Sequence, residues 1–266
     1  MSFKNFKSIS KKLRIMCVEL AYKSSSSHIG SSLSIIDILT VLYFEVLNIK
    51  PNNPKYKNRD KFILSKGHAC LAQYTVLYKA GFFDKKMLDT FGQNNSTLMT
   101  HINSEVPGVE FSTGSLGHGL PFATGIAYIN KILKKKIKIF VLISDGELNE
   151  GSNWEAIQFA SHHKLSNLNI LIDQNNEQSL GPTNKIINLE KLIDKFRCYN
   201  LDVCETDGHS YTKILKSLNR TSHNKSKVTI FKTIKGKGVS FMENKTLWHY
   251  KSPTYHEYSL ALKEIM

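Results

Sequence analysis

Two polar residues thirty positions apart, Asp145 and Asn175, have the chemistry to hold a divalent cation. Each follows an apolar, β-branched run of strand length, at 137–143 and 168–172. Mg²⁺ takes about six oxygen ligands and usually only one or two carboxylates, with phosphate oxygens and water completing the shell. Asp145 can supply charge, Asn175 an amide oxygen, and the backbone carbonyl near Glu177 a third ligand. Singly, these residues are typical of a turn and a strand cap; together they predict a magnesium site.

The segment between the two strands is expected to be a helical crossover. Ser152 and Glu155 predict a capping box at its start. Apolar residues then recur at helical spacing: Trp154, Ile157 and Ala160. A right-handed βαβ unit brings the carboxyl ends of its parallel strands side by side, so Asp145 and Asn175 should converge. Gly146 would let the backbone approach a phosphate closely, near the exposed N–H groups of a helix start.

Strand-like runs alternate with helical patterns along the chain. Strands are predicted near 61–64, 137–143, 168–173, 200–204 and 228–234, and helices near 5–23, 34–47, 69–80, 118–133, 152–164, 189–196 and 210–219. Ser34 and Asp37 predict a capping box for the second helix. This alternation predicts an α/β fold, a parallel sheet with helices on both faces and ligands at the carboxyl ends of the strands.

The composition favours a cytoplasmic protein with no nucleic-acid partner and no membrane association. The formal net charge is +14, but lysines are scattered and only four of the 36 basic residues are Arg, the usual base reader. A positive surface still attracts phosphorylated sugars. The four cysteines have neither metal-site nor disulfide spacing, and no apolar run is long enough to cross a membrane.

Several stretches of the chain resemble the thiamine diphosphate enzymes of the transketolase family. They are RDKFILSKGHA (59–69), PGVEFSTGSLGHGL (107–120), ISDGELNEG (143–151) with LIDQNN (171–176), TIKGKGVSFMEN (233–244) and LWHY (247–250). The resemblance runs from about Ser24 to Pro253 and implies the family's thiamine diphosphate-binding fold. The family pattern is not fully kept, because Ser144 replaces the first Gly of Gly-Asp-Gly and Ile29 follows His28 where Pro is usual.

Family members carry three domains, whereas 266 residues suffice for one α/β domain with a sizeable core. The resemblance therefore implies a single diphosphate-binding domain over 1–266, the N-terminal subunit of a split transketolase. The pyrimidine-binding and C-terminal domains are expected on a partner chain, in a hetero-oligomer built on a dimer.

The resemblance also assigns roles to individual residues. Those implied in catalysis are His28, His101 and His249, with His101 facing the substrate hydroxyls. Those implied in cofactor binding are His68, Gly114, Ser115, Leu116, Asp145, Gly146, Glu150, Asn175 and His249. Those implied in magnesium binding are Asp145, Asn175 and Glu177. Glu150 matches a buried glutamate that connects the two active sites of the dimer.

The implied activity moves a two-carbon ketol group from a ketose phosphate to an aldose phosphate, as in the pentose phosphate pathway. Two alternatives remain at this point. The chain could serve another split thiamine enzyme, a synthase or decarboxylase, although His101 and the GHA and WHY motifs favour transketolase. It could also be a non-catalytic scaffold subunit, against which the intact Asp145, Asn175, His68 and His249 argue.

Overall fold

In the computed structural model, which describes residues 3–266, five parallel strands form a single sheet in the order β1-β2-β3-β5-β4. The strands are β1 (Lys61–Leu64), β2 (Ile139–Ser144), β3 (Leu168–Gln174), β4 (Asp202–Asp207) and β5 (Lys227–Lys232). In the central ladders Ser144 pairs with Asp173, and Gln174 with Lys232. The carboxyl ends of β2, β3 and β5 therefore meet at one edge.

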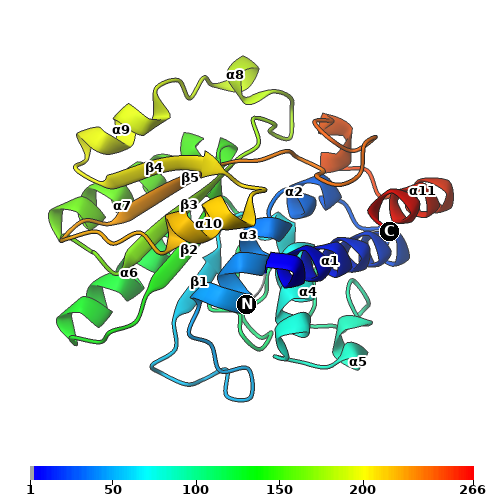
Figure 1. Ribbon diagram of the computed structural model, residues 1–266, viewed down its shortest axis with the longest axis horizontal. Coiled ribbons are helices and arrows are strands. Elements are labelled where there is room, and N and C mark those ends of the chain that lie inside the picture. Colours follow the sequence, from blue (N-terminus) through cyan, green and yellow to red (C-terminus); the bar gives the residue numbers. More distant parts are fainter. Residues whose placement is uncertain (1–2) are drawn as a thin grey trace.

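Helices cover both faces of the sheet (Figure 1). One face carries α1 (Phe3–Lys23), α2 (Ile29–Leu33), α3 (Ile36–Val41), α4 (Cys70–Ala80), α10 (Tyr211–Leu218) and α11 (Tyr255–Ile265). The other carries α6 (Gly119–Ile132), α7 (Gly151–His162) and α9 (Leu192–Cys198). Two one-turn helices, α5 (Lys85–Leu88) and α8 (Thr183–Ile186), lie in the connections. The predicted α/β fold with a doubly covered parallel sheet is confirmed.

The side chains of the central strands explain these two layers. In β2, Phe140 and Leu142 pack into the core beneath α1 and α4, whereas Val141 and Ile143 pack into the core beneath α6 and α7. All are fully buried. Burial of each such side chain contributes roughly 1.5–3 kcal/mol, so a strand apolar on both faces is stable only between two helical layers.

The predicted strands and long helices agree with the structure to within a few residues, but both predicted capping boxes are wrong. The Ser34 hydroxyl donates to Asp173 at 2.7 Å, and Ser34 ends α2 instead of starting a helix. The Ser152 hydroxyl donates to the Gly117 carbonyl at 2.7 Å, and α7 starts after Glu150 without a side-chain cap. Both hydroxyls donate hydrogen bonds to residues that are distant in the sequence instead of capping a helix. The helix α11, absent from the prediction, begins with a capping box at Thr254.

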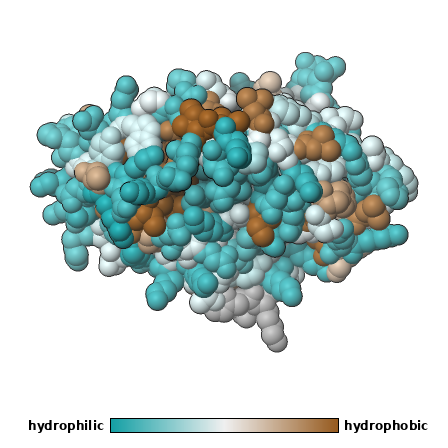
Figure 2. All heavy atoms as spheres, turned by 90° about the horizontal axis from the view of Figure 1, so that it is seen from above, coloured by the Kyte–Doolittle hydropathy of each residue, from teal (hydrophilic) through white to brown (hydrophobic). Residues whose placement is uncertain are grey.

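The surface is dominated by hydrophilic residues. Figure 2 shows them spread over the face seen from above, with hydrophobic residues in small separate groups. None of the helices described between residues 3 and 266 is both long and apolar enough to span a membrane.

Candidate active site

The edge where β2 and β3 end carries Asp145 and Asn175, as the spacing predicted. The Asp145 carboxylate accepts hydrogen bonds from the backbone N–H of Gly146 at 2.8 Å and of Asn176 at 2.7 Å. The Thr183 hydroxyl lies 3.3 Å from the same carboxylate. Asp145 thus ties the end of β2 to the loop that follows β3.

Asp145 is a buried carboxylate that no ion pair joins to another described residue. Burial, followed by the nearby negative charge of Asp173, raises the pKa of Asp145 to about 6, and its backbone hydrogen bonds only partly oppose this. A cation bound to this carboxylate would offset the free-energy cost of burying its negative charge. The site is therefore electrostatically prepared for a positive ligand.

Oxygen atoms near Asp145 could complete the shell of a hard cation. The Asn175 amide oxygen accepts from the Glu177 N–H at 3.0 Å and keeps a second lone pair. The Glu177 side chain accepts from Thr246 at 2.8 Å, and its backbone carbonyl oxygen, which accepts from the Lys235 ammonium at 3.4 Å, is a further oxygen near the site. No three His, Cys, Asp or Glu side chains among residues 3–266 form a metal cluster. A cation here would need mixed oxygen donors, the set that suits Mg²⁺.

A buried ion pair that the sequence patterns did not reveal lies beneath this edge. Lys66 and Asp173 are both fully buried, and the Lys66 ammonium lies 2.5 Å from the Asp173 carboxylate. Asp173 also accepts from Ser34, Asn175 and Thr233. Burial alone would raise the pKa of Asp173, but Lys66 and these hydrogen bonds outweigh it and lower the pKa. The pair holds four chain segments in register.

Lys235, which the sequence patterns also did not reveal, is a fully buried ammonium that pairs with no carboxylate among the described residues. It donates to the Gln178 carbonyl at 3.1 Å and lies 3.1 Å from the His249 Nδ1. Burial and then the charge of Lys66 lower the pKa of Lys235 to about 8. It is therefore cationic at neutral pH and could hold an anion. Lys66 and Lys235 both lie inside motifs that the sequence shows, but the sequence does not show that their side chains are buried.

Four histidines cluster above this edge: His28, His68, His101 and His249. The His28 ring centroid lies 5.2, 5.6 and 4.8 Å from those of the other three, respectively. His28 adopts a left-handed backbone conformation, with φ of 67°, and its N–H donates to the His249 carbonyl at 2.9 Å. Strained conformations of this kind in non-glycine residues cluster at functional sites.

These imidazoles are neutral at physiological pH. Burial, with the charges of nearby histidines and lysines, lowers the pKa of His28 to about 4 and of His249 to about 3. Burial likewise lowers the pKa of His68 and of His101. Because the ammonium of Lys235 can only donate, the His249 Nδ1 accepts and its Nε2 carries the proton. The cluster therefore offers neutral hydrogen-bonding groups without added charge.

A cavity of about 240 Å³ joins the strand edge to the histidine cluster. Its lining includes His28, His68, His101, Gly114, Leu116, Asp145, Gly146, Asn175, Glu177 and His249. A Cβ at Gly67 would lie 2.3 Å from the Thr113 carbonyl oxygen, so only glycine lets the loop of His68 touch the loop of Gly114. Close contact of these loops brings residues 68 and 114 into one site.

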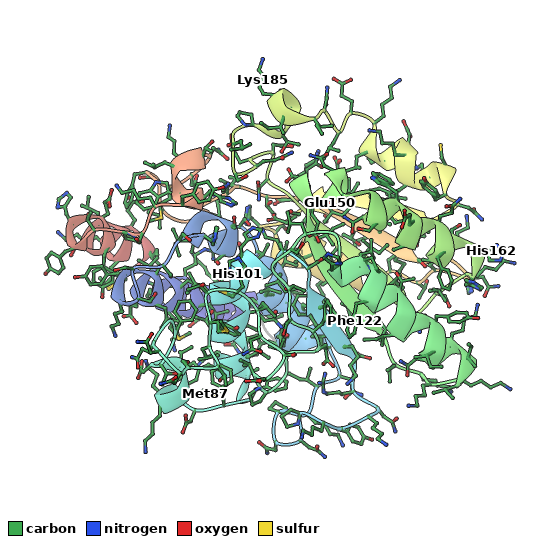
Figure 3. The ribbon with its side chains drawn as sticks, turned by 180° about the vertical axis from the view of Figure 1, so that it is seen from behind. Met87, His101, Phe122, Glu150, His162 and Lys185 are labelled. Atoms are coloured by element: carbon green, nitrogen blue, oxygen red, sulfur yellow. The ribbon has the colours of Figure 1, made fainter. Side chains whose placement is uncertain are left out.

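Two residues assigned by resemblance lie elsewhere. Ser115 is exposed and does not line the cavity. Glu150 is also exposed, on a loop separate from that of His101 (Figure 3), so its expected burial is not seen within this chain. Glu147 is the buried glutamate of that segment, and it accepts from Ser65 and from the Gly117 N–H. Glu147 therefore connects its own loop to the loops that carry Ser65 and Gly117.

Asp37 and His209 hold the loop that carries Lys235 in place. Arg14 pairs with both carboxylate oxygens of Asp37 at 3.0 and 2.6 Å. The His209 Nε2 accepts from the Ile234 N–H at 2.9 Å, so its Nδ1 carries the proton that bonds Asp37 at 2.8 Å. His209 thus fixes the peptide directly before Lys235.

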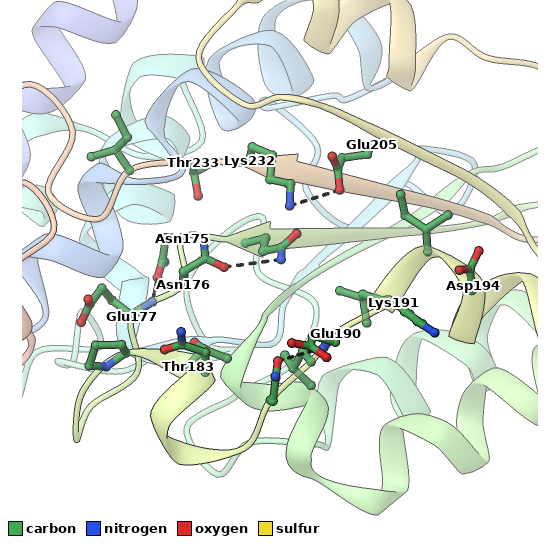
Figure 4. Close-up of a pocket in the computed structure, with 18 of the residues that line it drawn as sticks. Asn175, Asn176, Glu177, Thr183, Glu190, Lys191, Asp194, Glu205, Lys232 and Thr233 are labelled. Carbon is green, nitrogen blue, oxygen red and sulfur yellow. Dashed lines mark hydrogen bonds and ion pairs between the residues drawn. The ribbon is translucent and has the colours of Figure 1, made fainter.

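A larger cavity of about 870 Å³ adjoins the site and shares Asn175 and Glu177 (Figure 4). Two ion pairs lie in its wall, with Lys232 3.2 Å from Glu205 and Arg197 3.5 Å from Asp194. Among the described residues, no unpaired buried charge faces it, whereas Asp145 lines the smaller cavity and Lys235 contacts two residues of its wall, Gln178 and His249. The smaller cavity is therefore the candidate active site.

Comparisons with known proteins find one family over almost the whole chain. A family model described as "Transketolase, thiamine diphosphate binding domain" matches residues 6–257. One subunit of the apulose-4-phosphate transketolase of Phocaeicola vulgatus is 39% identical over 258 residues, 96% of this chain and 92% of the relative. The 6-deoxy-6-sulfo-D-fructose transketolase subunit SqwG of a Clostridium species is 35% identical over 256 residues, 95% of this chain and 93% of the relative. The crystal structure of transketolase from Campylobacter jejuni superposes with a TM-score of 0.95 at 30% identity, covering 100% of this chain and 43% of that one.

Proposed function

The chain belongs to the transketolase family, in which it corresponds to the thiamine diphosphate-binding domain, and we propose that it is the diphosphate-binding subunit of a two-chain transketolase. In this proposal it acts with a complementary, pyrimidine-binding chain. Together they transfer a two-carbon ketol group from a ketose phosphate to an aldose phosphate. Both relatives above are named as subunits, and the chain spans 43% of the C. jejuni transketolase.

The observation that carries the proposal is a pair of buried charges without partners: Asp145 lines the cavity, and Lys235 lies directly behind it, in contact with Gln178 and His249 of the lining. Asp145 is a carboxylate without a cation, and Lys235 is an ammonium without an anion. A magnesium diphosphate would neutralise both at once. In this arrangement Asp145, Asn175 and the Glu177 carbonyl would hold Mg²⁺, while Lys235 and the Gly146 backbone would face the phosphates.

Thiamine diphosphate, when bound, supplies the carbanion chemistry that breaks the carbon–carbon bond of the ketose. The chain's own residues would bind and orient the substrate and the cofactor. His28, His101 and His249 are neutral and lie within one cluster, so they can donate to and accept from substrate hydroxyl and carbonyl oxygens near neutral pH. His68, deeper and closer to Lys66, is assigned to the cofactor.

The substrate class follows from the site and the relatives. Neutral imidazoles suit a polyhydroxylated carbon chain, because each one can donate or accept a hydrogen bond. The two relatives are named for a phosphorylated and a sulfonated ketose. We therefore assign to this chain a ketose donor with an anionic group at its far end.

Reconstitution tests the proposal. The chain is purified alone and after co-expression with the pyrimidine-binding transketolase chain of its source organism, and transfer between a ketose phosphate and an aldose phosphate is measured with magnesium and thiamine diphosphate. We expect activity only in the complex. Equal activity of the isolated chain would refute the two-chain proposal, and an inactive complex that still binds the cofactor would favour a scaffold role.

A further inference from the structure

Tyr250 leaves a large aromatic side chain at the opening of the candidate active site. It lines the cavity, yet 61% of its surface is exposed. Its ring centroid lies 4.8 Å from that of His249 and 6.1 Å from that of His28. Across residues 3–266, no hydrogen bond joins the Tyr250 hydroxyl to another residue. An aromatic face and a free phenol thus border the two histidines assigned to the substrate.

The position of this ring is fixed by the turn that carries it. The Tyr250 N–H donates to the Leu247 carbonyl at 3.2 Å, and the His249 carbonyl accepts from the His28 N–H at 2.9 Å. Trp248 is buried and its indole donates to the Phe241 carbonyl at 3.0 Å. Tyr250 therefore stands on an anchored turn, and its exposure does not come from a loose loop.

The size of the cavity determines which part of a substrate reaches Tyr250. About 240 Å³ is small beside the roughly 300–1,000 Å³ typical of small-molecule sites. A ketose whose reacting carbonyl lies among the histidines has to extend its remaining carbons outward through the opening. Tyr250 lines the cavity, is exposed and lies next to His249, so a carbon chain that leaves past His249 would meet its ring.

We propose that Tyr250 is a specificity-determining residue that contacts the hydroxyl-bearing carbons beyond the reacting carbonyl and favours long ketose donors over short ones. This inference rests on the proposed function. A tyrosine ring covers the C–H side of a sugar chain with apolar surface, and its hydroxyl can exchange a hydrogen bond with a sugar hydroxyl. A three-carbon donor ends before the ring and gains neither contact.

The test compares two donors in the reconstituted complex, a five- to seven-carbon ketose phosphate and a three-carbon hydroxy-keto acid. The variants are Tyr250→Phe, Tyr250→Ala and the matched control Tyr255→Ala. Tyr255 is also a surface tyrosine, 70% exposed, but it lies on α11 outside the cavity lining. For each protein, kcat/KM for both donors, thiamine diphosphate affinity and the partner concentration at half-saturation are measured.

We expect the long-to-short ratio of kcat/KM to fall about threefold to tenfold in Tyr250→Phe, as for the loss of one hydrogen bond. It should fall about tenfold or more in Tyr250→Ala. Tyr255→Ala should keep the wild-type ratio, and cofactor affinity should stay the same throughout.

Three outcomes overturn the inference. The first is an unchanged ratio in both Tyr250 variants. The second is an increased partner concentration at half-saturation with the wild-type ratio restored at saturation, which would make Tyr250 a contact between the chains. The third is an equal loss of cofactor affinity and of both activities. A wild-type complex inactive with both donors would instead refute the proposed function itself.

Discussion

Replacing Asp145 with Asn should stabilise the unliganded protein and abolish magnesium-dependent cofactor binding. The pKa of Asp145 is raised from 3.8 to about 6, first by burial and then by Asp173. At about 1.4 kcal/mol for each pH unit, the ionised carboxylate costs the fold about 3 kcal/mol at pH 7. The amide can accept only one of the hydrogen bonds from Gly146 and Asn176, which loses about 1 kcal/mol. The net gain is about 2 kcal/mol.

The sign of this effect gives it a pH signature. Since the folded-state pKa of Asp145 is raised, the carboxyl imposes no penalty below pH 4, where it is protonated in both states. The penalty grows as the pH rises from about 4 to about 6 and is complete above that. Asp145→Asn should therefore match or fall slightly below the wild type at pH 4 and exceed it at pH 7.

Chemical denaturation of the unliganded proteins at pH 4 and pH 7 measures this difference, and calorimetry of the complex measures cofactor affinity with and without magnesium. Asp194→Asn is the matched control, because Asp194 is exposed on α9 and pairs only with Arg197 at the surface. It should change neither quantity. A destabilised Asp145→Asn at pH 7, or one that binds thiamine diphosphate as tightly as the wild type, would refute the electrostatic reasoning.

Other residues of the site lead to further predictions. Lys235→Met should weaken thiamine diphosphate binding by about 10- to 100-fold in calorimetry, since a charged hydrogen bond to phosphate is lost; unchanged affinity would remove Lys235 from the anion site. His101→Ala should lower kcat/KM for the ketose phosphate by about 100-fold while cofactor affinity is kept, and His68→Ala should instead weaken cofactor binding; equal losses of cofactor affinity would mean that the two roles are misassigned. Lys66→Met should lower the free energy of unfolding by about 3–5 kcal/mol in denaturant, because it leaves Asp173 charged and unpaired in the core; a smaller loss in Lys66→Met with Asp173→Asn would confirm that the charge is the cause.

Local sequence patterns predicted the structure correctly where the residues of a segment determine that segment's own conformation. The β-branched runs before Asp145 and Asn175 predicted two strands, and the crossover rule for parallel strands placed both residues at one edge. The two capping boxes failed for the opposite reason. Ser34 and Ser152 have the right local spacing, but Asp173 and Gly117 are better partners and belong to distant parts of the chain.

The charge state of the site depends on the tertiary structure. Lys66 and Asp173 are 107 residues apart, and only folding makes them a buried pair. Burial also makes the histidines neutral, raises the pKa of Asp145 and leaves Lys235 without an anion. The sequence specifies which groups are present and at which strand end they lie. Desolvation and charge pairing depend on everything packed around each group, so only the folded chain decides which charges remain unbalanced.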